Sequence, residues 1–316
     1  MRPETAPEIA IVGPLYPPTQ ARLEQMFVAH RLWEAADRDA LLRAIAPRVR
    51  AIAVYALDAC PAALIAALPR VEIIACFGIG VDRIDLAHAR ARGIRVTNTP
   101  DVVTEATADL ALGLILAVER RIAEGDRFVR RGAWRNGELR FGRSLGGRRL
   151  GILGLGRIGR AIAARALPFG MTVAYGGPRR KPDVPYSFFA DPAALAAWSE
   201  ILVVACPGGA ATRHLVGPSV LAALGREGTL INIARGSVVD EEALVAALAT
   251  GALGAAGLDV FAAEPNVPPA LTLMDNVVLM PHTGSATHET RAAMGDLMIA
   301  NLEAHFAGRP LPSPVV

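Results

Sequence analysis

The sequence predicts an α/β protein built on parallel sheets. Short apolar runs of strand length alternate with Ala/Leu-rich segments of helical length along its 316 residues. Hydrophobic residues make up 52% of the chain and aromatic residues only 5%, a composition typical of helices layered on parallel sheets. A chain of this length seldom folds around one core, so we expect two domains.

The first strand series lies in the N-terminal third. Its predicted strands cover residues 8–13, 51–55, 71–76 and 94–97. Helix-sized segments such as 61–68 and 84–92 separate them, and Gly93 is a plausible helix C-cap. The Ala/Leu-rich segment from Glu105 to about Arg131 predicts one long helix. It is too apolar to stand alone in water, so we expect it to cross between domains or to lie at a subunit interface.

A second strand series follows. It covers residues 151–154, 172–175, 201–206, 229–233, 254–260 and 277–280, and six strands are what a full dinucleotide-binding fold needs. The helical segment 286–306 is expected to return to the first domain. This organisation predicts a discontinuous first domain of residues 1–101 and 285–316 around a dinucleotide-binding domain of residues 102–284.

A glycine fingerprint stands where the first strand of this second series ends. Gly154 permits a tight turn, Gly156 lets the backbone approach a pyrophosphate, and Gly159 lets helix and strand pack closely. A helix-like stretch and a second strand complete a βαβ unit. The sequence therefore predicts a dinucleotide site, and a glycine-rich turn without a ligand is the alternative.

The end of the strand 172–175 indicates which dinucleotide is bound. An acidic residue there would bind the ribose hydroxyls of NAD. This chain instead has Arg179, Arg180 and Lys181, with no acid before Asp183. A guanidinium binds a 2′-phosphate that a carboxylate would repel, so the prediction is NADP, with NADPH preferred and NAD possible. A solvated basic turn is the alternative.

The candidate catalytic residues follow three separate strands. Arg235, Glu264 and His282 each come just after a predicted strand, where parallel sheets gather their ligand-binding loops. Arg235 would bind the carboxylate of a 2-oxo acid, and His282 would give a proton to the developing alkoxide. Glu264 would orient and stabilise the imidazolium, and Asp259 suits the nicotinamide carboxamide. Taken singly, a surface charge, a turn residue and a packed histidine are ordinary alternatives.

Composition excludes several other classes. The net charge is only +3 and the arginines are scattered, so we expect no nucleic-acid partner. Cys60, Cys76 and Cys206 lack paired spacing, which indicates buried free thiols in a reducing compartment and no metal site. Residues 1–8 contain acids and prolines, and no segment is long and apolar enough for a bilayer. A cytoplasmic protein without a membrane partner is the expectation.

Over nearly its whole length the sequence resembles the D-isomer-specific 2-hydroxyacid dehydrogenase family. The matching stretches are residues 77–85, 98–110, 154–159, 231–240, 257–265 and 280–285. The resemblance implies a Rossmann coenzyme domain inserted into a discontinuous flavodoxin-like substrate domain, and a homodimer formed through the coenzyme domains. It also implies that Arg235, Glu264 and His282 are the catalytic residues of an oxidoreductase.

The resemblance further implies a set of ligand contacts. Beyond the glycines and the basic turn, coenzyme contacts would fall on Arg157, Ile158, Cys206, Pro207, Thr212, Ala234, Asp259, His282 and Ser285. The loop Gly78-Ile79-Gly80 resembles the one whose backbone amides hold the substrate carboxylate, so Ile79 and Gly80 join Arg235 and His282 as substrate residues. The basic turn is similar to that of the NADPH-preferring glyoxylate, hydroxypyruvate and hydroxyphenylpyruvate reductases.

The choice of substrate stays open within these limits. Residues 54–57 would complete the pocket, and Trp134 or Phe141 could reach it from a neighbouring subunit, although simple packing explains them equally well. No cation for a substrate phosphate is evident, which favours an unphosphorylated 2-oxo acid. Glyoxylate or hydroxypyruvate is the first expectation and an aryl pyruvate the second. A non-catalytic NAD(P)H-sensing protein and an NAD-linked dehydrogenase working oxidatively are the alternatives from other classes.

Overall fold

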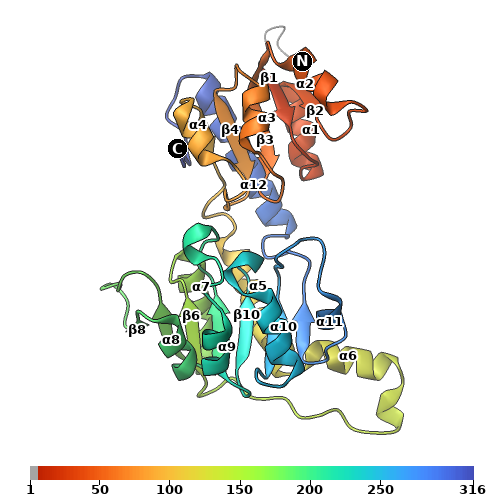
Figure 1. The fold of residues 1–316 in the computed structure, drawn as a ribbon, viewed down its shortest axis with the longest axis vertical. Coiled ribbons are helices and arrows are strands. Elements are labelled where there is room, and N and C mark those ends of the chain that lie inside the picture. The colour runs from red at the N-terminus through yellow and green to blue at the C-terminus, as the bar shows by residue number, and fades with distance from the viewer. Residues whose placement is uncertain (1–5) are drawn as a thin grey trace. The chain divides into compact units, whose positions relative to one another are not determined.

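The computed structural model describes residues 6–316, so the first five residues of the N-terminal segment considered above lie outside the described part. The chain divides into two compact units (Figure 1). Unit 1 comprises Met1–Val103 and Ser285–Val316, and unit 2 comprises Thr104–Gly284. The first boundary therefore falls at residue 103, where the sequence analysis placed it at 101.

Unit 1 contains a five-stranded parallel sheet in the order β2-β1-β3-β4-β5, the flavodoxin-like order. Its strands are β1 (Glu8–Ile11), β2 (Val28–Arg31), β3 (Val49–Tyr55), β4 (Ile73–Phe77) and β5 (Arg95–Thr97). The sequence analysis missed β2. This edge strand has the sequence VAHR and none of its residues is fully buried, so it lacks the apolar run that marks the others.

The helices of unit 1 cover both faces of its sheet. They are α1 (Pro17–Met26), α2 (Arg38–Ile45), α3 (Ala62–Ala67), α4 (Leu86–Ala91) and α12 (His288–Phe306). The C-terminal helix α12 packs on β4 and α1, where Met294, Met298 and Leu302 join the core of the sheet. A side chain at Gly295 would collide with Thr19, so this glycine allows α12 to approach α1 closely.

Unit 2 contains a seven-stranded parallel sheet in the order β12-β11-β10-β9-β6-β7-β8. Its strands are β6 (Arg149–Leu153), β7 (Thr172–Gly176), β8 (Ser187–Phe189), β9 (Ile201–Val204), β10 (Thr229–Asn232), β11 (Ala255–Leu258) and β12 (Val277–Leu279). The predicted count of six was wrong, because the short edge strand β8 was not recognised. The order reverses between β6 and β9, which is the ligand-binding point of a Rossmann sheet.

The helical elements of unit 2 lie along the connections of this sheet (Figure 1). The α-helices are α5 (Thr104–Glu119), α6 (Ile122–Arg130), α7 (Arg157–Ala166), α8 (Pro192–Trp198), α9 (Pro218–Leu224), α10 (Glu241–Ala249) and α11 (Pro269–Thr272). The 3-10 turns are η1 (Ala133–Arg135), η2 (Leu167–Phe169), η3 (Ala210–Thr212) and η4 (Gly236–Val238).

The single long helix predicted after Glu105 was wrong, because the chain forms two helices there. Arg121 adopts a left-handed conformation with φ of 54°, and this residue separates α5 from α6. The apolar α5 is packed in the core, whereas the charged α6 buries no residue. The change from apolar to charged composition near residue 120 therefore marks the end of the core helix.

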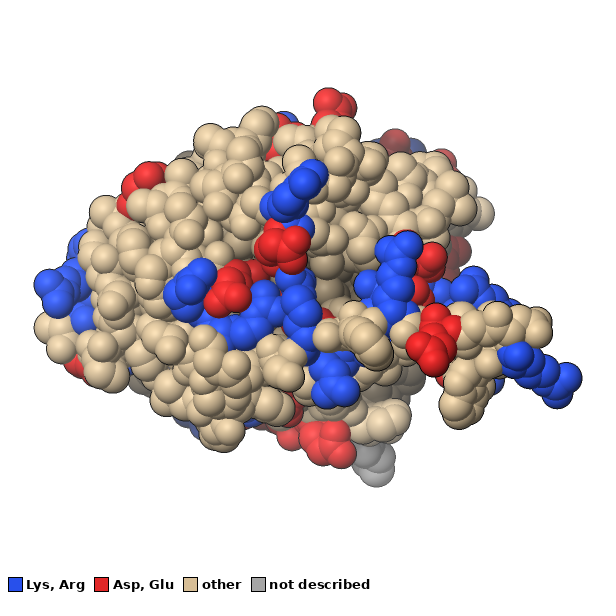
Figure 2. Space-filling model, turned by 90° about the horizontal axis from the view of Figure 1, so that it is seen from below, with Lys and Arg blue, Asp and Glu red and all other residues tan. Residues whose placement is uncertain are grey.

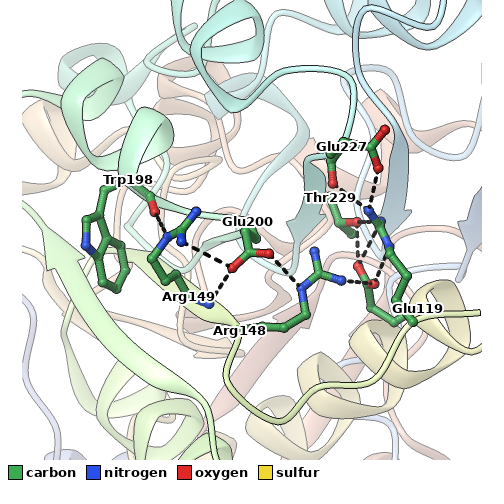
Figure 3. Close-up of polar contacts among 8 residues, drawn as sticks. Glu119, Arg148, Arg149, Trp198, Glu200, Glu227 and Thr229 are labelled. Atoms are coloured by element: carbon green, nitrogen blue, oxygen red, sulfur yellow. Dashed lines mark hydrogen bonds and ion pairs between the residues drawn. The ribbon is translucent and has the colours of Figure 1, made fainter.

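The buried carboxylate of Glu119 links separate segments of unit 2 (Figure 3). The side chain of Glu119, the last residue of α5, is 0% exposed. It accepts hydrogen bonds from Arg148 Nη1 at 2.6 Å, Arg143 Nε at 2.9 Å and Thr229 Oγ1 at 2.6 Å. Arg148 also lies 3.4 Å from Glu200, which continues the network. The core helix is thus joined to the segment before β6 and to the start of β10.

One face of the molecule carries charges of both signs. On the face drawn in Figure 2, acidic and basic side chains lie next to one another near the centre. Among the described residues, no helix combines the length and apolarity that crossing a membrane requires. All three cysteines are free, but only Cys60 and Cys76 are buried; the expectation of burial was wrong for Cys206, which is partly exposed.

Candidate active site

The glycine turn after β6 has the shape that a pyrophosphate needs. Gly154 has φ of +103°, and a Cβ there would lie 2.6 Å from the backbone nitrogen of Cys206. A Cβ at Gly159 would collide with the carbonyl oxygen of Gly154, whereas one at Gly156 would meet nothing within 4 Å. Helix α7 starts after Gly156 without a side-chain cap. The open space at Gly156 and the uncapped helix start therefore fit a bound pyrophosphate.

The loop after β9 faces this glycine turn across the point where the strand order reverses. Thr212 Oγ1 donates a hydrogen bond to the carbonyl of Pro207 at 2.7 Å, which closes the loop on itself. Burial raises the pKa of the Cys206 thiol to about 11, so this side chain is a neutral thiol at physiological pH. Contact of Cys206, Pro207, Thr212 or Ala234 with coenzyme stays a prediction.

The basic turn after β7 is free to bind an anion. Arg179 and Arg180 are both exposed, and neither forms an ion pair among residues 6–316. Asp183, the first acid after the strand, is engaged by Arg160 of α7 at 2.8 Å. The carboxylate nearest in sequence is therefore paired with another arginine, and the two guanidinium groups keep their hydrogen-bond donors.

A histidine and a glutamate form a hydrogen-bonded pair at the C-terminal edge of the same sheet. His282 Nδ1 lies 2.8 Å from Glu264 Oε2. The side chains are 22% and 19% exposed, so the pair is shielded but open to solvent on one side. Glu264 Oε1 also accepts the backbone N–H of Phe261 at 2.9 Å. Both carboxylate oxygens are thus fixed, and Nε2 is the imidazole nitrogen not held by Glu264.

The environment of Glu264 keeps it ionised. Burial by itself raises the pKa of this carboxyl, but the hydrogen bonds from His282 and from the Phe261 N–H, with the charges of His282 and Arg235, outweigh burial. The net result is a pKa below the ordinary value of 4.5. A permanently charged carboxylate therefore faces the imidazole at neutral pH.

Arg235 is positioned by its own loop. Asn232, buried at the end of β10, donates from Nδ2 to the Arg235 carbonyl at 3.0 Å and accepts the Ala234 N–H at 3.1 Å. A side chain at Gly236 would collide with the backbone of Phe261, so this glycine lets the Arg235 loop lie directly against the loop that precedes Glu264. The structure therefore brings Arg235 into the electrostatic environment of the pair.

Asp259 holds the histidine loop. It is 1% exposed, and its two oxygens accept the backbone N–H groups of Thr283 and Gly284 at 2.7 and 2.8 Å. The His282 N–H also donates to the Asp259 carbonyl at 2.8 Å, and His282 has φ of 55°. Burial raises the pKa of Asp259, against the effect of these N–H groups. Its observed contacts fix the loop, and the nicotinamide contact stays a prediction.

Unit 1 carries the predicted carboxylate loop after β4. The carbonyls of Gly78 and Ile79 accept hydrogen bonds from Thr99 N–H at 2.9 Å and Asn98 Nδ2 at 2.8 Å. Within the described part of the chain, the N–H groups of Ile79 and Gly80 have no acceptor. Thr99 and Asn98 thus engage the carbonyl groups of the loop, and the N–H groups of Ile79 and Gly80 remain available to a ligand. Ser285 also belongs to this unit, so its coenzyme contact stays a prediction.

Two supporting residues were missed in the sequence. Asn232 is the buried last residue of β10, directly after two apolar residues, and a polar side chain at that position is a detectable signal for a hydrogen-bonded amide. Gly208 packs against the side chain of Arg235, where a Cβ would lie 2.6 Å from Cγ. No local pattern marks Gly208, because the contact joins loops far apart in the sequence.

Comparison with known proteins places this geometry in a family. The model of the D-isomer specific 2-hydroxyacid dehydrogenase NAD-binding domain matches residues 112–284. A glyoxylate/hydroxypyruvate reductase A of Arabidopsis thaliana is 48% identical over 308 residues, and a hydroxyphenylpyruvate reductase of Plectranthus scutellarioides is 48% identical over 309. Each alignment covers 98% of this chain and 98% of the relative.

Solved structures agree in fold. The NADPH-dependent glyoxylate/hydroxypyruvate reductase of Sinorhizobium meliloti, in complex with NADP and malonate, is 44% identical with a TM-score of 0.93. The match covers 99% of this chain and 97% of that one. The glycine turn, the His–Glu pair and these relatives lead to one conclusion: the chain belongs to the D-isomer specific 2-hydroxyacid dehydrogenase family.

Proposed function

We propose that this oxidoreductase reduces a small 2-oxo acid of the glyoxylate or hydroxypyruvate type to the D-2-hydroxy acid, using NADPH. The observation that carries the proposal is the hydrogen bond of 2.8 Å between His282 Nδ1 and Glu264 Oε2, with Arg235 close enough to lower the pKa of Glu264. A general acid, its charged partner and a carboxylate-binding guanidinium are the groups that the reduction of a 2-oxo acid requires.

The residues divide the chemistry as follows. Bound NADPH supplies the hydride. His282 donates its Nε2 proton to the oxygen that develops negative charge at C2, and Glu264 stabilises the imidazolium that serves as the acid. Arg235 binds the substrate carboxylate and polarises the neighbouring carbonyl. In unit 1, the unengaged N–H groups of Ile79 and Gly80 support their role as donors to a substrate carboxylate.

The basic turn supports NADPH as the preferred coenzyme. Arg179 and Arg180 are exposed and unpaired within the described chain, and Arg160 neutralises Asp183. A 2′-phosphate placed at this turn would meet two guanidinium groups and no free carboxylate. The Sinorhizobium meliloti relative is named as NADPH-dependent, which is the same preference.

One assay tests the proposal. Loss of NADPH and of NADH is followed with glyoxylate, hydroxypyruvate and hydroxyphenylpyruvate. We expect turnover with NADPH and one of the two smaller acids. Consumption of neither coenzyme, together with tight coenzyme binding, would instead support the sensing protein. Faster use of NADH would overturn the coenzyme assignment, and a preference for the aryl acid would support the function named for the Plectranthus scutellarioides relative.

We also propose that the protein is a homodimer. Helix α6 buries no residue, and the arm from α6 to the segment before β6 exposes Ile122, Val129, Trp134 and Phe141, the last at 94%. A cavity of about 390 Å³ is lined by residues of this arm, of the end of α5 and of the segment around the start of β12. The exposed apolar side chains on this arm support its burial against a second copy of the chain. Sedimentation of the purified protein tests it, and a monomer at micromolar concentration would refute it.

Two finer assignments belong to the same proposal. The substrate-binding role falls on unit 1 and the dinucleotide-binding role on unit 2, because the unengaged amides lie in the first and the glycine turn in the second. The free thiols of all three cysteines support a cytoplasmic location. Fractionation of cells expressing the tagged protein tests the location.

A further inference from the structure

An arginine of unit 1 is stacked on two aromatic rings that the proposed mechanism does not use. Arg291, in the first turns of α12, donates from Nη1 to the Tyr55 hydroxyl at 3.0 Å. Its Cζ lies 5.3 Å from the centre of the Tyr55 ring and 5.9 Å from that of Phe77. The two rings pack edge to face with centroids 6.0 Å apart. Arg291 is thus held in one place by a phenol and two ring faces.

Within the described part of the chain this guanidinium has no counter-ion. Among residues 6–316, no carboxylate lies within ion-pairing distance of Arg291, and the bond to Tyr55 uses one of its five N–H donors. Its neighbour on the same helix, Asp296, pairs with Arg22 instead. A partly buried arginine without an anion keeps strong donors for a ligand group.

The stack adjoins the proposed carboxylate loop. Tyr55 and Phe77 are the last residues of β3 and β4 and pair with each other in the sheet. Gly78 follows Phe77 directly, and a Cβ on Gly78 would collide with Ala56, the residue after Tyr55. Ile79 and Tyr55 pack on the same hydrophobic cluster. The donors of the loop and the stacked arginine therefore belong to one edge of one sheet.

We propose that Arg291, positioned by Tyr55, is a specificity-determining residue that binds an oxygen acceptor on C3 of the substrate. This inference rests on the proposed function, because it assumes that Ile79 and Gly80 hold the carboxylate. In a 2-oxo acid, C3 is two bonds from the carboxylate carbon. A hydroxyl on C3 meets the free donors of Arg291 beside this loop, whereas a methyl group there leaves them unpaired.

Three acids of graded structure make the test. Glyoxylate has no C3, pyruvate has a methyl group there, and hydroxypyruvate has a hydroxyl on it. We expect Arg291→Met to lower kcat/KM for hydroxypyruvate by at least about tenfold more than for glyoxylate, the loss of one charge-assisted hydrogen bond. Arg291→Lys, which keeps the charge but loses the planar fork, should fall between. Tyr55→Phe keeps the ring and removes the hydroxyl. It should therefore lower kcat/KM for hydroxypyruvate relative to that for glyoxylate by a smaller factor.

A matched control lies on the same helix. Asp296→Asn removes the exposed ion pair with Arg22 and should leave all three rates and their ratios unchanged. If Arg291→Met lowered kcat/KM by the same factor for glyoxylate, pyruvate and hydroxypyruvate, the inference would be overturned in favour of a packing role. If Arg291→Met left the ratio of kcat/KM for hydroxypyruvate to kcat/KM for pyruvate unchanged, the inference would be overturned as well. Inactivity of the unsubstituted enzyme with every acid would reject the proposed function itself, and the inference with it.

Discussion

Glu264→Gln is the substitution that tests the proposed acid most directly. The change keeps the size of the side chain and removes its charge. In the structure Oε2 faces His282 Nδ1 at 2.8 Å and Oε1 accepts the Phe261 N–H at 2.9 Å. A glutamine must place its NH2 group toward one of these two positions. The substitution therefore removes the ionic partner and also loses one of the two hydrogen bonds.

The expected magnitude follows from the burial of the pair. A hydrogen bond to a charged group contributes about 1.5–3 kcal/mol. Because the two side chains are 22% and 19% exposed, solvent weakens the interaction and we take the lower end of that range. About 1.5–2 kcal/mol corresponds to a loss of about 10- to 30-fold in kcat/KM. The effect should appear in kcat, because the imidazolium is needed in the reaction step.

The pH profile gives the decisive readout. Since the pKa of Glu264 is below 4.5, this carboxylate stays ionised over an assay range of about pH 5–9 and contributes no limb of its own. Because Glu264 is charged at every pH in this range, Glu264→Gln should lower kcat throughout it. Fluorescence titration with NADPH serves as the control and should give an unchanged Kd. An unaltered rate and pH profile would refute the assigned role of Glu264.

Three further substitutions test other parts of the structure. His282→Ala should remove nearly all turnover with little change in NADPH affinity, and a variant that keeps most of its rate would show that the proton comes from another group. Arg179→Asp should raise KM for NADPH by about tenfold and barely affect NADH; equal effects would return this turn to the solvated-surface interpretation. Glu119→Gln should lower the free energy of unfolding by about 3 kcal/mol in urea, because it leaves two arginines beside a neutral group. The exposed Glu227→Gln is its control and should change stability by less than about 0.5 kcal/mol.

The fold was predictable where the chain repeats a strong local pattern. The apolar runs of β3 and of β9 to β11 were located within a few residues because these strands are buried and read as continuous hydrophobic sequence. The strands β2 and β8 were missed because they are only four and three residues long and none of their residues is buried. The break at Arg121 was missed because neither glycine nor proline marks it.

For the candidate site, the meeting of the three loops was predictable and the contacts that support them were not. Arg235, Glu264 and His282 each follow a strand, so the topology of a parallel sheet was enough to bring their loops to one edge. Their mutual geometry depends on contacts such as Gly236 against Phe261, which join loops from different strands. The local sequence around each residue does not indicate such contacts. Arg291 was not predicted for the same reason, because more than two hundred residues separate it from Tyr55 and Phe77 in the sequence.

Asp259 holds the backbone of the loop that carries His282. A left-handed conformation at a histidine, with φ of 55°, is unfavourable unless neighbouring bonds impose it. Here Asp259 accepts three backbone N–H groups, one on its carbonyl and two on its carboxylate, from the consecutive residues 282–284. These bonds select the conformation that turns His282 toward Glu264. The orientation of the imidazole is therefore determined by the backbone of residues 282–284, which the buried Asp259 holds in place.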